Sequence, residues 1–103
     1  MIDDIAQPDT EELDLPRLLA ALSDPGRLAM VRTLDDSGEE SCARILEEVG
    51  RGYSKSTMSH HLKVLREAGL TRTRVEGSRR YVSLRRGDLD ARFPGLLDAV
   101  LEA

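Results

Sequence analysis

Five polar residues between positions 55 and 63 have the chemistry and spacing to contact a nucleic acid. At 3.6 residues per turn they fall on one side of a helix: Lys55, Ser56, Ser59, His60 and Lys63. Amines, hydroxyls and an imidazole can hydrogen-bond to base edges in a major groove and to phosphate oxygens. Positions 54–66 contain no acidic residue, whereas a solvated surface helix normally alternates its charges. The pattern therefore favours a recognition helix over an ordinary amphipathic surface helix.

The helix that carries these residues has its own start signal, buried stripe and stop signal. Ser54 can cap its N-terminus through the hydroxyl, and Gly69 supplies the left-handed residue that ends it. Met58, Leu62 and Leu65 recur at i, i+4 and i+7, which predicts that they face the core. The polar residues should then face solvent on the opposite side.

A basic hairpin is expected directly after this helix. Residues 70–75 and 80–86 have the Thr, Val and Tyr content of short strands, and a turn at 76–78 separates them. Six arginines lie in or beside the hairpin: Arg72, Arg74, Arg79, Arg80, Arg85 and Arg86. A helix of this kind followed by a basic wing predicts DNA binding. Lys63 should then contact a phosphate, while Arg79 and Arg80 near the wing tip should reach the backbone or the minor groove.

The rest of the chain is expected to be helical, apart from its start. Residues 1–11 are acidic and without periodicity, which predicts a disordered tail and leaves 12–103 as one domain. Helix start signals predict a first helix from near Asp14, a second from Asp24-Pro25 and a third over about 41–49. A last helix is expected over roughly 88–102, either kinked at Pro94 or beginning there.

Several separated motifs resemble the ArsR/SmtB family of winged helix-turn-helix repressors. Residues 54–70, 22–28, the hairpin and residues 88–101 fit that family in order, so the resemblance covers the chain from about residue 15 to its end. It implies a mainly α (α+β) fold, with a two-stranded β-wing and a dimer interface built from the first and last helices. It also implies that residues 12–103 form a DNA-binding and dimerisation domain. The positions at which relatives contact DNA match Lys55, Ser56, Ser59 and His60.

Charge is distributed unequally along the chain. Residues 1–50 contain 13 acidic and 4 basic residues, residues 51–87 contain 2 and 10, and the remainder contains 4 and 1. The net charge of −4 therefore does not argue against DNA binding, because the local field at the contact surface governs phosphate binding. One cysteine, no signal sequence and no long apolar run predict a cytoplasmic protein.

Metal, redox and catalytic roles find little support in the sequence. Cys42, His60 and His61 are the only soft metal ligands, and the resembled family's paired-cysteine and terminal-helix histidine sites are missing. The helical spacing of Cys42 from residues 45, 46 and 49 favours a buried core thiol over a sensor thiol. No Gly-rich phosphate loop or nucleophile turn is present. We expect no metal, no cofactor and no enzymatic activity.

Together with the family resemblance, which alone implies repression, these observations predict a homodimeric repressor that binds a pseudo-palindromic bacterial operator in double-stranded DNA. Two alternatives stay open at this point. One is a winged-helix module that binds a partner protein through its acidic face or its apolar terminal helices. The other is a DNA-binding sensor that responds to a metal, an oxidant or a small molecule at an unrecognised site. Salt-sensitive binding to duplex DNA separates the first alternative from the other two functions.

Overall fold

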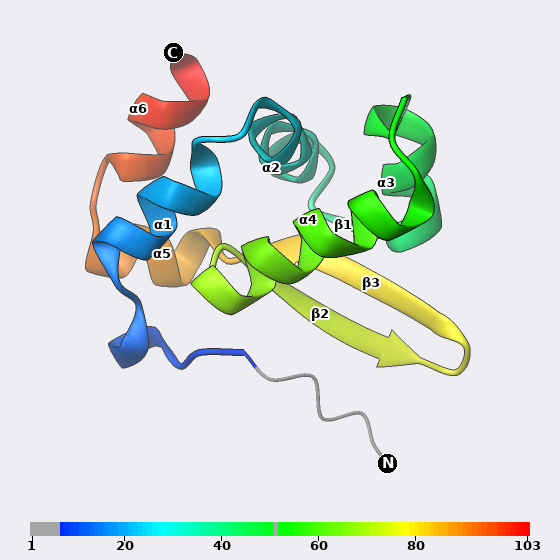
Figure 1. The fold of residues 1–103 in the computed structure, drawn as a ribbon. Coiled ribbons are helices and arrows are strands. Elements are labelled where there is room, and N and C mark those ends of the chain that lie inside the picture. The colour runs from blue at the N-terminus through cyan, green and yellow to red at the C-terminus, as the bar shows by residue number, and fades with distance from the viewer. Residues whose placement is uncertain (1–6, 51) are drawn as a thin grey trace.

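The computed structural model describes residues 7–50 and 52–103 as helices packed on one side of a three-stranded sheet (Figure 1). The hairpin formed by the last two strands projects past the helices. This is the mainly helical winged helix-turn-helix arrangement that the sequence predicts. In chain order the elements are η1 (Thr10–Glu12), α1 (Leu15–Leu22), α2 (Pro25–Ser37), β1 (Glu39–Ser41), α3 (Cys42–Val49), α4 (Lys55–Ala68), β2 (Thr71–Glu76), β3 (Arg79–Leu84), α5 (Arg86–Arg92) and α6 (Leu96–Glu102).

The starts of the first four α-helices are set by side-chain caps. In each case an oxygen accepts a hydrogen bond from the backbone N–H three residues further on, which satisfies one of the free amides of the first turn. The four caps are Asp14, Asp24, Ser41 and Ser54. Gly69 ends α4 at a φ of +94°, and a side chain at this position would also collide with Leu13.

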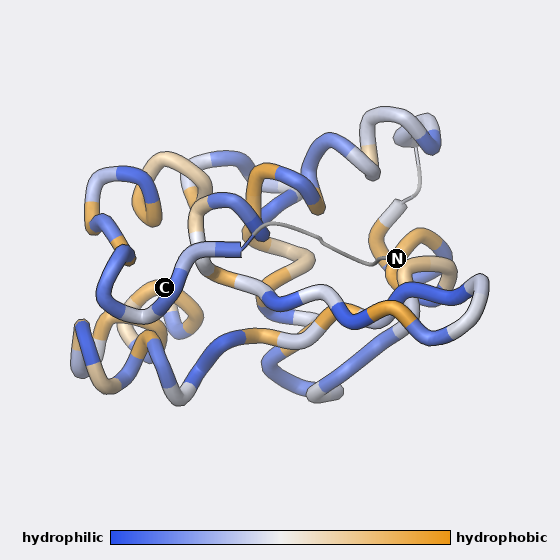
Figure 2. Tube along the Cα trace, turned by 90° about the horizontal axis from the view of Figure 1, so that it is seen from below, coloured by the Kyte–Doolittle hydropathy of each residue, from blue (hydrophilic) through white to orange (hydrophobic). Residues whose placement is uncertain are grey.

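The core lies between the helices and the inner face of the sheet. Its fully buried side chains are Leu18, Met30, Val31, Leu34, Ile45, Leu65, Leu70, Val82, Leu89 and Leu97. Met58 and Leu65 of α4 are buried as predicted, whereas Leu62 is only partly buried. Along β2, exposed residues alternate with buried or partly buried ones, as expected where one sheet face packs on the core. In Figure 2, strongly hydrophilic segments of the wing are separated by paler and hydrophobic ones.

The apolar stripe of α1 is only half covered by its own subunit. Leu18 and Leu22 are buried, but Leu15 is 39% exposed and Leu19 is 47% exposed. Burying two such leucines would remove apolar area from water at about 25 cal/mol per Å². The exposed half of α1 is therefore a surface available for association.

The sheet contains one strand more than the predicted two-stranded wing. β1 pairs antiparallel with β3, so that the strand order is β1-β3-β2. Its three residues lie opposite Ser83, Val82 and Tyr81. The hairpin beyond Tyr81, with Arg79 and Arg80, therefore continues as two strands only.

The prediction of a disordered tail up to residue 11 is wrong for residues 7–11. The backbone N–H of Asp9 donates to Glu12 Oε1 at 2.8 Å, and residues 10–12 form a 3-10 turn. Contacts with residues more than 60 positions away order this segment: Thr73 N–H donates to Gln7 Oε1, and Arg85 donates to the Pro8 carbonyl. Residues 1–6 lie outside the described part of the chain.

The predicted last helix is two helices. α5 begins at Arg86, two residues earlier than expected, and α6 begins at Leu96, just after Pro94. Proline lacks the N–H that a continuous helix needs, so the chain turns at residues 93–95. Within the described residues, no helix is long and apolar enough to cross a membrane.

Candidate nucleic-acid interface

The polar face of α4 is open to solvent along its whole length. All five side chains singled out from the sequence are exposed: Lys55, Ser56, Ser59, His60 and Lys63. Within residues 7–50 and 52–103, neither Lys55 nor Lys63 forms an ion pair. The face therefore presents positive charge that no carboxylate of the described residues offsets, together with polar side chains, of which the Ser56 hydroxyl already shares a hydrogen bond of 3.1 Å with the Ser54 hydroxyl.

The wing is less basic than its arginine count suggests. Arg74 forms ion pairs with Glu39 and with Glu76, each at 2.9 Å, and its guanidinium also lies over the Tyr81 ring. The hydrogen bond from Arg74 lowers the pKa of the Glu39 carboxyl below its usual range. These carboxylates offset the charge of Arg74, which leaves it a weak candidate for phosphate binding.

Arg85 and Arg86 do not belong to the basic surface of the wing, contrary to the sequence interpretation. Arg85 is 4% exposed, and its Nε donates to Asp88 Oδ2 at 2.9 Å. Arg86 is the first residue of α5 and pairs with Asp35 at 2.8 Å and Asp98 at 3.0 Å. Both arginines instead tie α5 to neighbouring parts of the fold.

Arg79 and Arg80 remain as the exposed cations of the wing tip, without an ion pair among the described residues. They point to opposite faces, because successive side chains of a strand alternate. Arg80 shares the face of buried Val82, and its positive charge reaches the Cys42 thiol. The two arginines thus present charge on both sides of the tip.

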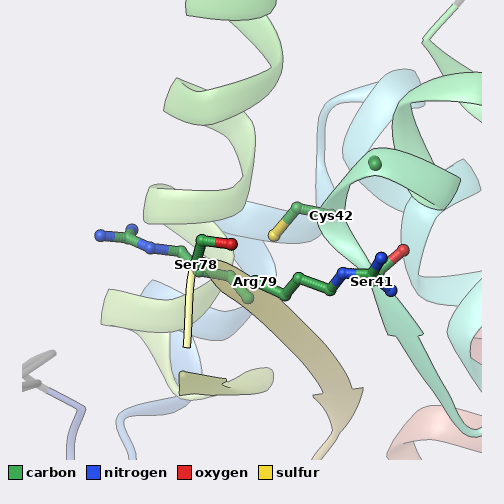
Figure 3. Close-up of a pocket in the computed structure, with 6 residues that line it drawn as sticks. Ser41, Cys42, Ser78 and Arg79 are labelled. Atoms are coloured by element: carbon green, nitrogen blue, oxygen red, sulfur yellow. The ribbon is translucent and has the colours of Figure 1, made fainter. Parts of the chain in front are cut away.

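Two grooves connect the wing tip to α4. The larger, about 510 Å³, is lined by Ser41, Cys42, Ala43, Ser78, Arg79 and Arg80. In Figure 3 the start of α3 forms one wall, with Ser41 and Cys42, while Ser78 and Arg79 come from the wing. The smaller, about 170 Å³, shares Cys42 and Ala43 and also includes Lys55 and Ser59. The sequence did not single out Ser41, Ala43 or Ser78, since only the folded chain brings the start of α3 beside the wing.

Cys42 lies at the junction of these grooves as a free, partly buried thiol. Burial raises the pKa of the thiol, although the charges of Arg80 and Arg66 oppose that effect. A raised pKa favours the protonated form, which is a poor nucleophile and a poor metal ligand. The described residues contain no group of three or more His, Cys, Asp or Glu side chains arranged to hold a metal ion.

A polar cluster joins α4 to the start of α2. His61 is 8% exposed, its Nδ1 lies 3.3 Å from Arg27 Nη1, and its Nε2 lies 3.9 Å from Asp24 Oδ2. The Arg27 backbone N–H, bonded to Asp24, lowers the pKa of that carboxyl below its usual value. The Tyr53 ring meets His61 edge-on, with centroids 5.4 Å apart. His61 thus faces inward, whereas its neighbour His60 faces solvent.

Known proteins that are similar to this chain over most of its length are helix-turn-helix transcriptional regulators. The model of a helix-turn-helix domain family matches residues 22–74, which include α2 to α4. The chain is also similar to YceK of Bacillus subtilis (strain 168), described as an uncharacterized HTH-type transcriptional regulator. The two are 45% identical over 85 residues, which covers 82% of this chain and 83% of that protein.

Solved structures extend the similarity to the whole fold. The transcriptional repressor BigR from Xylella fastidiosa is 32% identical with a TM-score of 0.67, covering 85% of this chain and 83% of that one. A homodimeric winged helix-turn-helix DNA-binding domain from Mycobacterium bovis, a possible ArsR-family transcriptional regulator, is 30% identical with a TM-score of 0.68. That alignment covers 85% of this chain and 78% of the other.

Proposed function

The chain belongs to the ArsR family of winged helix-turn-helix transcriptional regulators, and we propose that it is a homodimeric repressor of a pseudo-palindromic operator. In this proposal α4 enters the major groove of double-stranded DNA. Lys55, Ser56, Ser59 and His60 read base edges or adjacent phosphates, and Lys63 binds a phosphate. Arg79 and Arg80 contact the backbone or the minor groove beside it.

The observation that carries the proposal is the exposed part of α4 over residues 55–63, which contains no acidic side chain, next to the two exposed arginines of the wing tip. Most of the other arginines discussed above are paired with carboxylates, so positive charge is left where α4 and the wing meet. Phosphates neutralised there would release counterions, which makes affinity depend steeply on salt. The acidic N-terminal half of the chain would disfavour binding in other orientations.

Dimerisation is supported by the half-covered stripe of α1. Leu15 and Leu19 are exposed, Phe93 directly after α5 is partly buried, and α6 carries the partly buried Val100 and Leu101. The Mycobacterium bovis domain is a homodimer by its own description. In a dimer, two copies of α4 about 34–36 Å apart would reach successive major grooves, so the operator would share the protein's two-fold symmetry.

We further infer that the protein acts in the cytoplasm and has no catalytic role. Ser59 and His60 lie on an exposed face, and among the described residues no carboxylate is within hydrogen-bonding range of them. The two ring nitrogens of His61 already lie next to Arg27 and Asp24. An effector that binds elsewhere and changes the affinity for DNA is compatible with this proposal. It would be found by screening compounds on the DNA-binding signal.

A fluorescence-anisotropy titration tests the proposal. Purified protein is titrated into the duplex upstream of its own gene and into a scrambled duplex, each at two salt concentrations. We expect saturable binding that prefers the native duplex and weakens as salt rises. Sedimentation of the complex should give two chains per duplex.

Other outcomes separate the alternatives. Equal, weak binding to both duplexes would place the operator elsewhere, and genomic selection of bound fragments would then locate it. No binding at low salt would contradict the DNA-binding function and favour a protein partner. Binding by a single chain per duplex would contradict the dimer.

A further inference from the structure

Residues 7–13, here called the N-terminal strap, meet the open edge of the wing at Gln7 and then continue past α5 to the end of α4. Thr73 N–H donates to Gln7 Oε1 at 2.7 Å, and Gln7 Nε2 donates back to the Thr73 carbonyl at 3.4 Å. β2 is an edge strand, because the strand order is β1-β3-β2. An added strand would make this same pair of bonds to an edge residue. The Gln7 carboxamide therefore takes the place of a fourth strand at one position.

The contact between Gln7 and Thr73 lies level with the point where β1 pairs with the opposite edge of the hairpin. Thr73 is opposite Val82 of β3, and Val82 is in turn opposite Glu40 of β1. Gln7 and β1 thus hold the hairpin from both sides at the same row. One row further on, at Tyr81, β1 ends and the hairpin continues alone to the tip. An isolated two-stranded hairpin is at best marginally stable in water, so the direction of the tip depends on the rows that are held.

The strap itself is fixed to parts of the fold outside the wing. The Pro8 carbonyl accepts from Arg85 Nη1 at 2.6 Å, and the Thr10 carbonyl accepts from Arg92 Nη1 at 2.6 Å. Leu13 is buried against the end of α4. These contacts join the strap to α5 and to the core, which makes it a firm support for the edge of β2.

We propose that Gln7 is a positioning residue for the wing, holding β2 so that Arg79 and Arg80 can contact DNA. The inference rests on the proposed DNA binding, and it assigns a role in that binding to a residue that does not touch DNA. It differs from a simple stabilising role in one respect. Loss of the Gln7 bonds should weaken DNA binding only when the wing arginines are present to bind.

The test uses Gln7→Met, which keeps the side-chain length and removes both hydrogen bonds. Amide hydrogen exchange is followed by NMR, and DNA affinity by anisotropy. The amide of Thr73 should exchange at least about fivefold faster, because it loses its acceptor. Affinity should fall roughly threefold to tenfold, the range expected for one or two net hydrogen bonds.

The same substitution is then made in a protein that already carries Arg79→Ala and Arg80→Ala. There it should change affinity by less than about twofold, since coupled residues are non-additive. Ser37→Ala is the matched control, because it removes a neutral side-chain hydrogen bond of 2.9 Å to the Thr33 carbonyl. It should leave DNA binding unchanged. Exchange at Met30 and Leu34 in α2 reports global stability and should not change with Gln7→Met.

Each other outcome contradicts the proposal in a distinct way. An equal loss of affinity in both backgrounds would show that Gln7 acts through general stability. Faster exchange at Thr73 with unchanged affinity would show that the strap supports the edge without positioning the tip. If the wild-type protein binds DNA but its Thr73 amide exchanges without protection, the Gln7–Thr73 hydrogen bonds do not form in solution. That result would overturn the role of Gln7 and leave the proposed DNA binding intact. Failure of the wild-type protein to bind any duplex would overturn the proposed function, and the role of Gln7 with it.

Discussion

The hydroxyl of Tyr53 occupies the space that a side chain at Gly26 would need. A Cβ at Gly26 would lie 2.6 Å from Tyr53 Oη, closer than two such atoms can approach. Tyr53 belongs to the segment between α3 and α4, and Gly26 to the first turn of α2. This contact and the edge-on packing of Tyr53 against His61 hold the turn of the helix-turn-helix against α2. The angle of the recognition helix therefore depends on residues far from its DNA-facing side.

Gly26→Ala tests this relationship. Alanine is favoured over glycine in a helix by about 1 kcal/mol, but here it must displace the Tyr53 ring. We expect Gly26→Ala to be more favourable in a Tyr53→Ala background than in the wild type by roughly 1 kcal/mol. Urea unfolding of the four proteins measures this difference. Equal effects of Gly26→Ala in both backgrounds would show that the proximity of Tyr53 to position 26 does not affect the free energy of unfolding.

Alanine at Ser59 or His60 should change which DNA sequence is preferred. Both side chains are exposed on the face of α4 that we propose lies in the major groove. Loss of a base contact costs about 1–3 kcal/mol and relaxes discrimination at that base pair. Competition between native and single-mismatch duplexes measures this loss. A uniform loss on all sequences would place these residues on the phosphates instead.

Arg80→Ala should reduce the dependence of DNA binding on salt, whereas Arg74→Ala should have little effect on it. Arg80 has no ion pair among the described residues, while Glu39 and Glu76 already offset the charge of Arg74. Removing one phosphate contact lowers the slope of log K against log salt by about 1. Titrations over a range of salt concentrations give both slopes. An unchanged slope for Arg80→Ala would show that Arg80, and with it this side of the wing, does not contact phosphates.

Acid should weaken the fold partly through Asp88. The hydrogen bond from Arg85 holds the pKa of Asp88 below its usual value, so this stabilisation is complete above the unfolded pKa near 4. It is lost as the pH falls through the lower folded pKa. Asp88→Asn should therefore cost roughly 1–3 kcal/mol at neutral pH, where it leaves Arg85 without its counter-charge. Urea unfolding at neutral and acid pH should show this cost shrinking below about pH 4; a constant difference would contradict the assignment.

Cys42 should react slowly with alkylating agents in the folded protein. Burial raises the pKa of its thiol, so little thiolate is present at neutral pH. Iodoacetamide should modify it at least about tenfold more slowly than in urea. Wild-type and Cys42→Ser proteins should then give the same DNA-binding response to peroxide. Loss of binding in the wild type alone would identify Cys42 as a redox sensor.

Much of the helix-turn-helix unit could be predicted from the sequence because its signals are local. Ser54 and Gly69 bound the recognition helix through contacts with the backbone within a few residues. The exposed polar face follows from the same 3.6-residue period that buries Met58 and Leu65. Caps and helical periodicity depend on neighbouring residues, so they can be identified without knowledge of the rest of the fold.

The remaining features depend on distant partners, which the sequence does not display. β1 is a strand only because β3 lies beside it, and its Glu-Glu-Ser sequence has no strand pattern of its own. Gln7 lies within an acidic stretch that looks disordered until Thr73 is placed next to it. Arg85 and Arg86 looked like wing residues because their counter-ions, Asp88 and Asp35, become neighbours only on folding.

Chemical-shift mapping shows whether the exposed face of α4 and the wing tip bind DNA. ¹⁵N-labelled protein is titrated with its upstream duplex and followed by amide NMR. We expect the largest shifts at residues 55–63 and 78–80, with little change in the acidic segment 35–40. Shifts centred on that acidic segment or on α6, with none at residues 55–63, would contradict DNA binding by α4.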